Sequence, residues 1–212
     1  MSASLHPPRF SSKTFGTIQT GFASKTANLT PSVKEQVRLS TRPCVEVQAS
    51  ETPVLEEIRV DMAEVKVESR PVLLVTNVGS CVAICIHDSR NKRGGLLHIM
   101  LPSSKRASNE SLPYKYADTA VPALAEFLRK LGKGDVCLLA KIAGGANMFA
   151  HLKSSLLNIG AKNVEAVKEA LEANGIRLLA EDVGGAYGRR VFFNVVTGSV
   201  YIQRVGGQVK KI

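Results

Sequence analysis

The sequence predicts an α+β fold, a layered sandwich with mostly antiparallel sheets and two main helices. About eight strand-like segments and two helical segments follow one another after an N-terminal stretch without periodicity. Most consecutive strand segments are joined by short turns, which is how antiparallel neighbours connect. Helices interrupt the strands only twice, and this argues against a doubly wound parallel sheet, in which strands and helices alternate.

The strands are predicted where apolar and polar residues alternate or where β-branched residues form a short run. Residues 64–68 (EVKVE) alternate, and residues 71–76 form a Val- and Leu-rich run that indicates a buried strand. After the break at Gly79-Ser80, the further predicted strands cover residues 81–87, 95–101, 136–142, 176–181, 190–196 and 199–204.

Two segments carry apolar residues at helical spacing. Residues 118–131 form the first, which ends before Gly132. Residues 164–173 form the second, with Asn163 as its predicted N-cap and Gly175 as its C-terminal stop. The long polar segment in front of the first helix, residues 102–116, is a candidate functional loop.

The first 58 residues differ from the rest of the chain. They are rich in Ser and Thr, carry scattered Pro and show no sustained hydrophobic periodicity. We expect a disordered extension, or residues upstream of a true start near Val60 or Met62, ahead of one folded domain at 59–212. A transit-like peptide is the alternative because such peptides are also Ser-rich and acid-poor, but no clear amphipathic helix supports it.

Composition indicates a soluble cytoplasmic protein. Apolar residues make up 44% of the 212 residues, but no apolar run approaches the roughly 18–20 residues that span a bilayer. The N-terminus lacks the apolar core of a secretory signal, so we do not expect membrane insertion or export. The four cysteines are therefore expected to be reduced thiols.

The chain is basic, with 28 Lys and Arg against 18 Asp and Glu and a net charge of +10. Such a surface attracts acidic partners. The basic residues form no long run, and no aromatic motif of the kind that stacks on RNA bases is present. We therefore expect an acidic protein partner in preference to a nucleic acid.

The candidate site is a predicted hairpin of residues 81–87 and 92–98 around a turn at 88–91. In that register Cys81 lies directly opposite His98, and directly opposite residues have Cβ atoms about 4.5–5.5 Å apart. A register shift of two residues would keep the shared face but separate the two groups. The hairpin thus predicts a thiol and an imidazole on one face.

A Cys–His pair is the minimum for thiol nucleophilic catalysis, because the imidazole takes the thiol proton. Gly79-Ser80 permits a tight turn and leaves amide N–H groups for an oxyanion. Thr76 or Asn77 is expected to orient the far side of the His98 ring. The residues alone leave a purely structural role open, since a cysteine in an apolar strand is usually a small buried hydrophobe.

Two other kinds of site are not supported. Cys81, Cys85, His87 and His98 are chemically suited to zinc, but a rise of about 3.3 Å per strand residue separates the first two by roughly 13 Å. The same separation forbids a disulfide between them. No metal site is therefore predicted.

A glycine pair follows the strand at 136–142. The sequence Gly144 to Asn147 (GGAN) lacks the lysine and spacing of a phosphate-binding loop. It is expected to form a tight turn at positive φ, and the amide of Asn147 is a candidate to line the site.

Several motifs occur in a specific order along the folded domain. They are Gly79 to Ala83 (GSCVA), Gly94-Gly95, His98 to Pro102 (HIMLP), Lys115 to Asp118 (KYAD), Lys141 to Phe149 (KIAGGANMF), Ile159 to Asn163 (IGAKN) and Asp182 to Gly185 (DVGG). This series resembles the CheD family of chemoreceptor glutamine deamidases. The resemblance covers essentially residues 62–204.

The resemblance implies an αββ sandwich and a Cys–His–Thr hydrolase that needs no cofactor. It implies that Cys81 is the nucleophile and His98 the base. The family's threonine lies in the preceding strand, and Thr76 is its match. Thr76 stands one residue nearer the cysteine than the family pattern has it, so Asn77 remains the alternative.

The reaction implied is hydrolysis of glutamine side-chain amides in methyl-accepting chemotaxis receptors, giving glutamate and ammonia. The acidic helical surfaces of such receptors suit the net charge of +10. The resemblance also implies binding to a CheC-type phosphatase. A non-catalytic adaptor that binds receptors and this phosphatase is the alternative, but retention of both Cys81 and His98 favours the enzyme.

Overall fold

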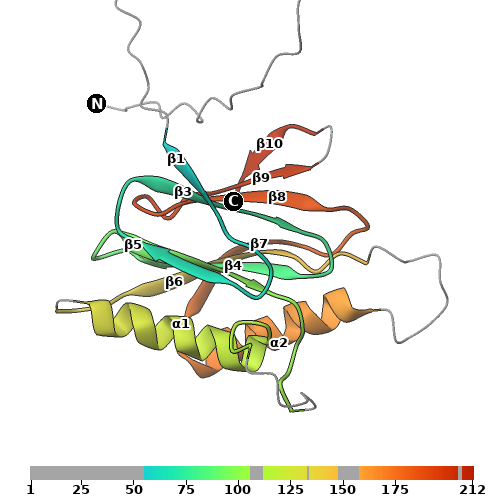
Figure 1. Ribbon diagram of the computed structural model, residues 1–212, viewed down its shortest axis with the longest axis horizontal. Helices are drawn as coiled ribbons and strands as arrows, with labels where there is room; N and C mark the ends of the chain where they lie inside the picture. Colours follow the sequence, from blue (N-terminus) through green and yellow to red (C-terminus); the bar gives the residue numbers. More distant parts are fainter. Residues whose placement is uncertain (1–54, 106–111, 133, 148–157, 205–206) are drawn as a thin grey trace, which may run out of the picture. The chain divides into compact units, whose positions relative to one another are not determined.

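Two stacked five-stranded sheets and two helices make up the fold of the computed structural model (Figure 1). The structure describes residues 55–105, 112–132, 134–147, 158–204 and 207–212. Among these residues, the sheet drawn farthest from the helices, here the outer sheet, has the order β1(Glu56–Arg59), β3(Val72–Val78), β8(Arg189–Asn194), β9(Val200–Arg204) and β10(Val209–Lys211).

The middle sheet separates the outer sheet from the helices (Figure 1). Its order is β2(Val65–Glu68), β5(Arg93–Ile99), β4(Val82–Asp88), β6(Leu138–Gly144) and β7(Arg177–Val183). Helices α1(Ala117–Leu131) and α2(Ile159–Ala173) lie along its other face (Figure 1). The predicted αββ sandwich with two main helices is confirmed.

Both sheets are mixed. Six of the eight ladders between described strands are antiparallel, as expected, but β1 pairs with β3 and β6 pairs with β7 in parallel. The second parallel pair arises because α2 lies between β6 and β7 in the chain, which is the usual crossover between parallel strands. The structure also adds two short strands, β1 and β10, to the eight that the sequence predicts.

Two apolar layers hold the fold together, and β4 contributes to both. Val82, Ile84 and Ile86 pack in the layer between the middle sheet and the helices. Ala83 and Cys85 pack in the layer between the two sheets. A strand that is buried on both faces is apolar at nearly every position, which explains the composition of this segment.

The first helix matches its prediction, whereas the second begins earlier. Its N-cap is Asn158, whose side chain accepts a hydrogen bond from the amide of Ala161 at 3.4 Å. The prediction of Asn163 as N-cap is wrong. Gly160 lies in the first turn of this helix, and a Cβ there would lie 2.5 Å from the carbonyl oxygen of Gly145. This glycine therefore permits close packing.

The N-terminal boundary is only partly described. The strand β1 includes residues 56–58, which the sequence analysis assigned to the extension, and residues 1–54 lie outside the described residues. Of the helices that the structure describes, none has the length and apolar character to cross a membrane.

Candidate active site

Two strands and the turn before a third bring three side chains to the layer between the two sheets. Thr76 lies on β3 of the outer sheet, His98 lies on β5 of the middle sheet, and Cys81 directly precedes β4. Thr76 Oγ1 lies 2.8 Å from His98 Nδ1. Cys81 packs against the same apolar layer and is half-buried.

The hydrogen bonds of Thr76 fix the tautomer of His98. The hydroxyl of Thr76 donates to the carbonyl oxygen of Val60 at 2.7 Å, and that oxygen can only accept. The single hydroxyl proton is thereby used, so Thr76 Oγ1 accepts from His98 Nδ1–H. The lone pair of the neutral ring then lies on Nε2, which has no hydrogen-bond partner among the described residues.

Burial keeps the imidazole neutral. His98 is only 3% exposed, and burial lowers the pKa of its ring from 6.5 to about 4, against a smaller opposing effect of Asp61. At neutral pH, Nε2 is therefore a hydrogen-bond acceptor and a base. The same environment raises the pKa of the Cys81 thiol, since burial outweighs the opposing effect of its own amide. The resting pair is thiol and imidazole.

The predicted hairpin register is wrong by two residues. His98 pairs with Ala83, and the last pair of the hairpin joins Asp88 to Arg93. Asp88 resembles a turn residue in the sequence, but its carboxylate is buried and accepts a hydrogen bond from Arg93, which draws it into the ladder. The turn consequently begins one residue later than predicted.

This shift places Cys81 and His98 in diagonal positions on one face. Diagonal neighbours have Cβ atoms on the order of 7–8 Å apart, farther than the directly opposite pair that was predicted. The two side chains share no hydrogen bond in the described structure. In many enzymes without substrate, catalytic hydrogen bonds are long and tighten only in the complex.

Thr76, and not Asn77, contacts the imidazole. Successive residues of a strand point to opposite faces, and Asn77 is exposed while Thr76 is 3% exposed. The offset of one residue from the family pattern therefore does not prevent the threonine from reaching His98.

Backbone hydrogen bonds hold the turn at residues 79–81. The amide of Gly145 donates to the Cys81 carbonyl at 2.8 Å, and the amide of Ala146 donates to the Gly79 carbonyl at 2.7 Å. Gly144 has a φ of 120°, and a Cβ there would lie 2.2 Å from the Cys81 carbonyl oxygen. The predicted tight turn at the glycine pair is confirmed, and it supports the cysteine turn.

Two backbone N–H groups of this turn have no oxygen partner in the described structure. Within the part of the chain that the structure describes, neither the Ser80 N–H nor the Cys81 N–H donates to a backbone or side-chain oxygen. The role predicted for Gly79 and Ser80 in lining an oxyanion site stays a prediction. The Cys81 N–H acts on the thiol of its own residue, and N–H groups beside a nucleophile are the kind of donor that can stabilise an oxyanion.

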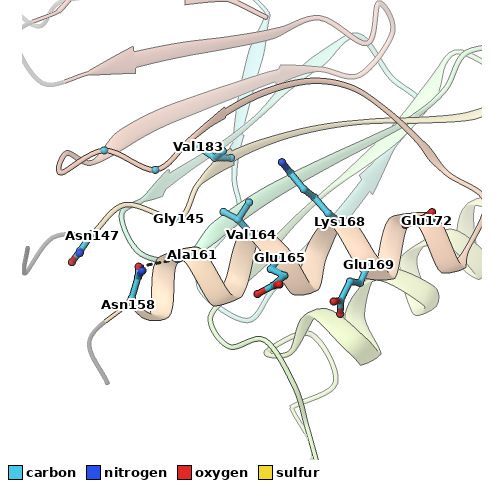
Figure 2. Close-up of a pocket in the computed structure, with 12 residues that line it drawn as sticks. Gly145, Asn147, Asn158, Ala161, Val164, Glu165, Lys168, Glu169, Glu172 and Val183 are labelled. Atoms are coloured by element: carbon cyan, nitrogen blue, oxygen red, sulfur yellow. Dashed lines mark hydrogen bonds between the residues drawn. The ribbon is translucent and has the colours of Figure 1, made fainter. Parts of the chain in front are cut away.

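Asn147 lies apart from these groups. Its backbone amide donates to the Gly185 carbonyl at 2.8 Å, and its side chain lines a cavity of about 620 Å³ along α2 (Figure 2). The lining of that cavity includes Gly145 but not Thr76, Cys81 or His98. The described contacts do not bring Asn147 to the thiol or the imidazole.

Sequence reasoning missed a further polar residue at this site. Asn163 is completely buried, and its side-chain amide donates to the carbonyls of Ser80 at 3.0 Å and Met100 at 2.9 Å. Ser80 directly precedes Cys81 in the chain, and Met100 lies two residues after His98. A polar residue on the inner face of an otherwise amphipathic helix was the available signal.

No metal-binding cluster was found in the described residues, where no three His, Cys, Asp or Glu side chains lie close enough to hold an ion. The described cysteines, Cys81, Cys85 and Cys137, are free thiols. The thiol, the imidazole and the backbone amides are the reactive groups that this geometry brings near one another.

Comparisons with known proteins show which family the chain resembles. Residues 100–204 match the family described as CheD chemotactic sensory transduction. A protein of Desulforamulus reducens is 44% identical over 158 residues, which cover 74% of this chain and 95% of that protein. One of Clostridium botulinum strain Hall is 45% identical over 160 residues, covering 74% and 99%. Both carry the name "Probable chemoreceptor glutamine deamidase CheD".

Proposed function

This chain belongs to the CheD family, and on that premise we propose that it deamidates glutamine side chains of chemoreceptors with Cys81 as nucleophile and His98 as base. The observation that carries the proposal is the hydrogen bond from His98 Nδ1–H to Thr76. It directs the basic lone pair of Nε2 away from Thr76, on the sheet face that Cys81 shares.

The first step is acylation of the thiol. Cys81 Sγ attacks the carboxamide carbon of the glutamine while His98 Nε2 takes the thiol proton. A neutral imidazole and a protonated thiol are the resting forms that this step requires. The carbonyl oxygen becomes an oxyanion, and the N–H groups of Ser80 and Cys81 stabilise it.

The second step releases ammonia and the third restores the enzyme. The His98 imidazolium gives its proton to the departing nitrogen, which leaves as ammonia and forms a thioester on Cys81. His98 then takes a proton from a water molecule, whose oxygen attacks the thioester carbon. The C–S bond breaks, and the Cys81 sulfur recovers its proton from the His98 imidazolium. The product is glutamate, so each turnover adds a negative charge to the receptor.

The net charge of the chain supports a finer proposal for the substrate, and the resemblance to the CheD family supports one for a second partner. With a net charge of +10, the protein suits acidic helical surfaces of methyl-accepting chemotaxis receptors in the cytoplasm. A CheC-type phosphatase is the second proposed partner.

The test is ammonia release from a purified cytoplasmic receptor fragment, with mass spectrometry to locate each glutamine converted to glutamate. The wild type is expected to release ammonia, Cys81→Ala none, and His98→Gln to lose about 10²–10⁴-fold in kcat. Cys137→Ala, which removes another described free thiol, is the matched control and should retain full activity.

Two outcomes would contradict the proposal. If Cys81→Ala releases ammonia at the wild-type rate, Cys81 is not the nucleophile. If the wild type binds the receptor fragment but releases no ammonia, the protein acts as an adaptor.

A further inference from the structure

All three carbonyls of the turn at residues 79–81 are hydrogen-bond acceptors. The backbone amides of Gly145 and Ala146 hold the two outer carbonyls. The middle one, the carbonyl of Ser80, is held by a side chain, the Asn163 amide at 3.0 Å. A substitution can therefore remove this one support selectively.

The Ser80 carbonyl belongs to the same peptide unit as the Cys81 N–H. In a planar trans peptide the C=O and N–H bonds point in opposite directions. The bond from Asn163 to the Ser80 oxygen consequently fixes the direction of the Cys81 N–H. It also polarises the peptide, which makes the N–H a stronger donor.

The orientation of the Asn163 amide is determined by its surroundings. Its nitrogen lies 3.0 Å from the Ser80 oxygen and 2.9 Å from the Met100 oxygen, so both N–H bonds are used. The reverse orientation would place the Asn163 oxygen against two carbonyl oxygens. The side chain is completely buried, and it links the turn before Cys81 to the residue that follows β5.

Packing of α2 keeps Asn163 within reach. One turn earlier, Gly160 lies against the backbone of Gly145 and Ala146, and a Cβ at Gly160 would approach their carbonyl oxygens to 2.5 and 2.6 Å. The helix therefore rests directly on the loop that supports the cysteine turn.

We propose that Asn163 is a positioning residue that aims the Cys81 amide at the oxyanion by holding the carbonyl of the same peptide unit. It touches neither substrate nor the reacting atoms. The inference rests on the proposed function in that Cys81 is taken as the nucleophile and its amide as an oxyanion donor.

The test compares two reactions of the same thiol. Acetylation by p-nitrophenyl acetate forms an S–C bond, passes through an oxyanion and expels p-nitrophenolate, with the thiol proton passing to His98. Alkylation by iodoacetamide forms an S–C bond and expels iodide without an oxyanion. The rates measured with Cys81→Ala are subtracted from both, which removes reaction at other residues. Neither reaction uses the receptor, so both rates can be measured whether or not the receptor is a substrate.

Complete loss of one oxyanion donor slows a reaction about 10²–10³-fold. Asn163→Ala only reorients the Cys81 N–H, so acetylation is expected to slow by part of that factor, at least about tenfold. Alkylation should remain unchanged. Asn163→Ser restores a hydrogen-bond donor on a shorter side chain, so its acetylation rate should lie between those of the wild type and Asn163→Ala. Asn174→Ala is the control because Asn174, the C-cap of α2, donates a side-chain hydrogen bond to the Ala170 carbonyl at 2.7 Å, at the opposite end of the helix. It should change neither rate.

Rates are compared at a temperature at which circular dichroism shows every variant folded. Equal acetylation by Asn163→Ala and wild type would overturn the inference, and so would an equal loss in both reactions, which indicates a displaced thiol. With the receptor fragment, Asn163→Ala should lower kcat and leave KM unchanged. Absence of ammonia from the wild type would refute the proposed function, while the two thiol reactions still decide the role of Asn163.

Discussion

The two ends of the β4–β5 hairpin both bury an ionisable side chain, but they satisfy it differently. At the turn end, the Asp88 carboxylate accepts hydrogen bonds from Arg93, from Asn91 and from the amide of Cys137. At the open end, Nδ1 of the His98 imidazole has Thr76 as its partner, and Nε2 has no partner in the described structure.

This difference separates a residue that is stabilised as a charge from one that we propose to be the base. Burial alone would raise the pKa of Asp88, yet the hydrogen bonds from Asn91, Cys137 and Arg93 outweigh it and lower that pKa. For His98 burial dominates and lowers the pKa to about 4. Asp88 is thus stabilised as a charge, whereas His98 remains a neutral base. In the proposed reaction, the unpaired Nε2 of His98 accepts the proton of the Cys81 thiol.

Removing the partner of Asp88 should produce the largest effect on stability. Arg93→Ala leaves a completely buried carboxylate without its cation, and breaking a buried pair costs about 3–5 kcal/mol. Urea denaturation should show this loss in the free energy of unfolding. The kcat of the folded protein should stay unchanged, because Arg93 lies at the opposite end of the hairpin.

Arg90→Ala is the matched control for that experiment. Arg90 lies in the same turn, but its pair with Asp135 is exposed, and exposed pairs contribute about 0–1 kcal/mol. If Arg93→Ala kept full stability but lost much of its kcat, the turn end of the hairpin would not have the purely structural role proposed for it.

Stability should depend on pH through His98 over a defined range. Below its ordinary pKa of 6.5 the unfolded chain protonates His98, while the folded protein keeps it neutral down to about 4. The unfolded state therefore binds more protons between these values, and stability falls as pH falls. The loss is on the order of 3 kcal/mol. The Asp88 carboxylate loses its contribution to stability only below its ordinary pKa of 3.8, which lies outside this pH range.

His98→Gln isolates this effect. Burial also lowers the pKa of His87, so the wild type and the variant share any contribution from that ring. The difference between their free energies of unfolding should therefore change between pH 7 and pH 4 by the His98 contribution alone. Parallel stability curves would show that His98 is not buried as a neutral ring.

The sequence predicted the pattern of strands well because apolar periodicity reports burial directly. It placed Thr76, Cys81 and His98 in neighbouring segments, and the structure brings Thr76 and His98 into contact. The hairpin register failed because Asp88 has the polarity of a turn residue, and only its buried partner Arg93 reveals that it belongs to the ladder.

Contacts between distant residues were beyond sequence reasoning. Asn163 lies 83 residues from Ser80, and a polar residue near a helix start is predicted as a cap unless the packing is known. The short strand β10 has only three residues, Val209–Lys211, too few for an alternating pattern to be recognised.

The smallest predicted effect concerns Thr76, the hydrogen-bond partner of the His98 imidazole in the described structure. Thr76→Val keeps the shape of the side chain but removes the acceptor for His98 Nδ1–H and the donor to Val60. Without this bond the ring is free to adopt the other tautomer, so kcat should fall roughly tenfold, a fraction of the 10²–10⁴-fold that a general base contributes. KM should be unchanged. Asn77→Ala, one residue along the strand and exposed, is the control and should retain full activity. Equal losses in both variants would mean that the strand, and not the hydroxyl, matters for catalysis.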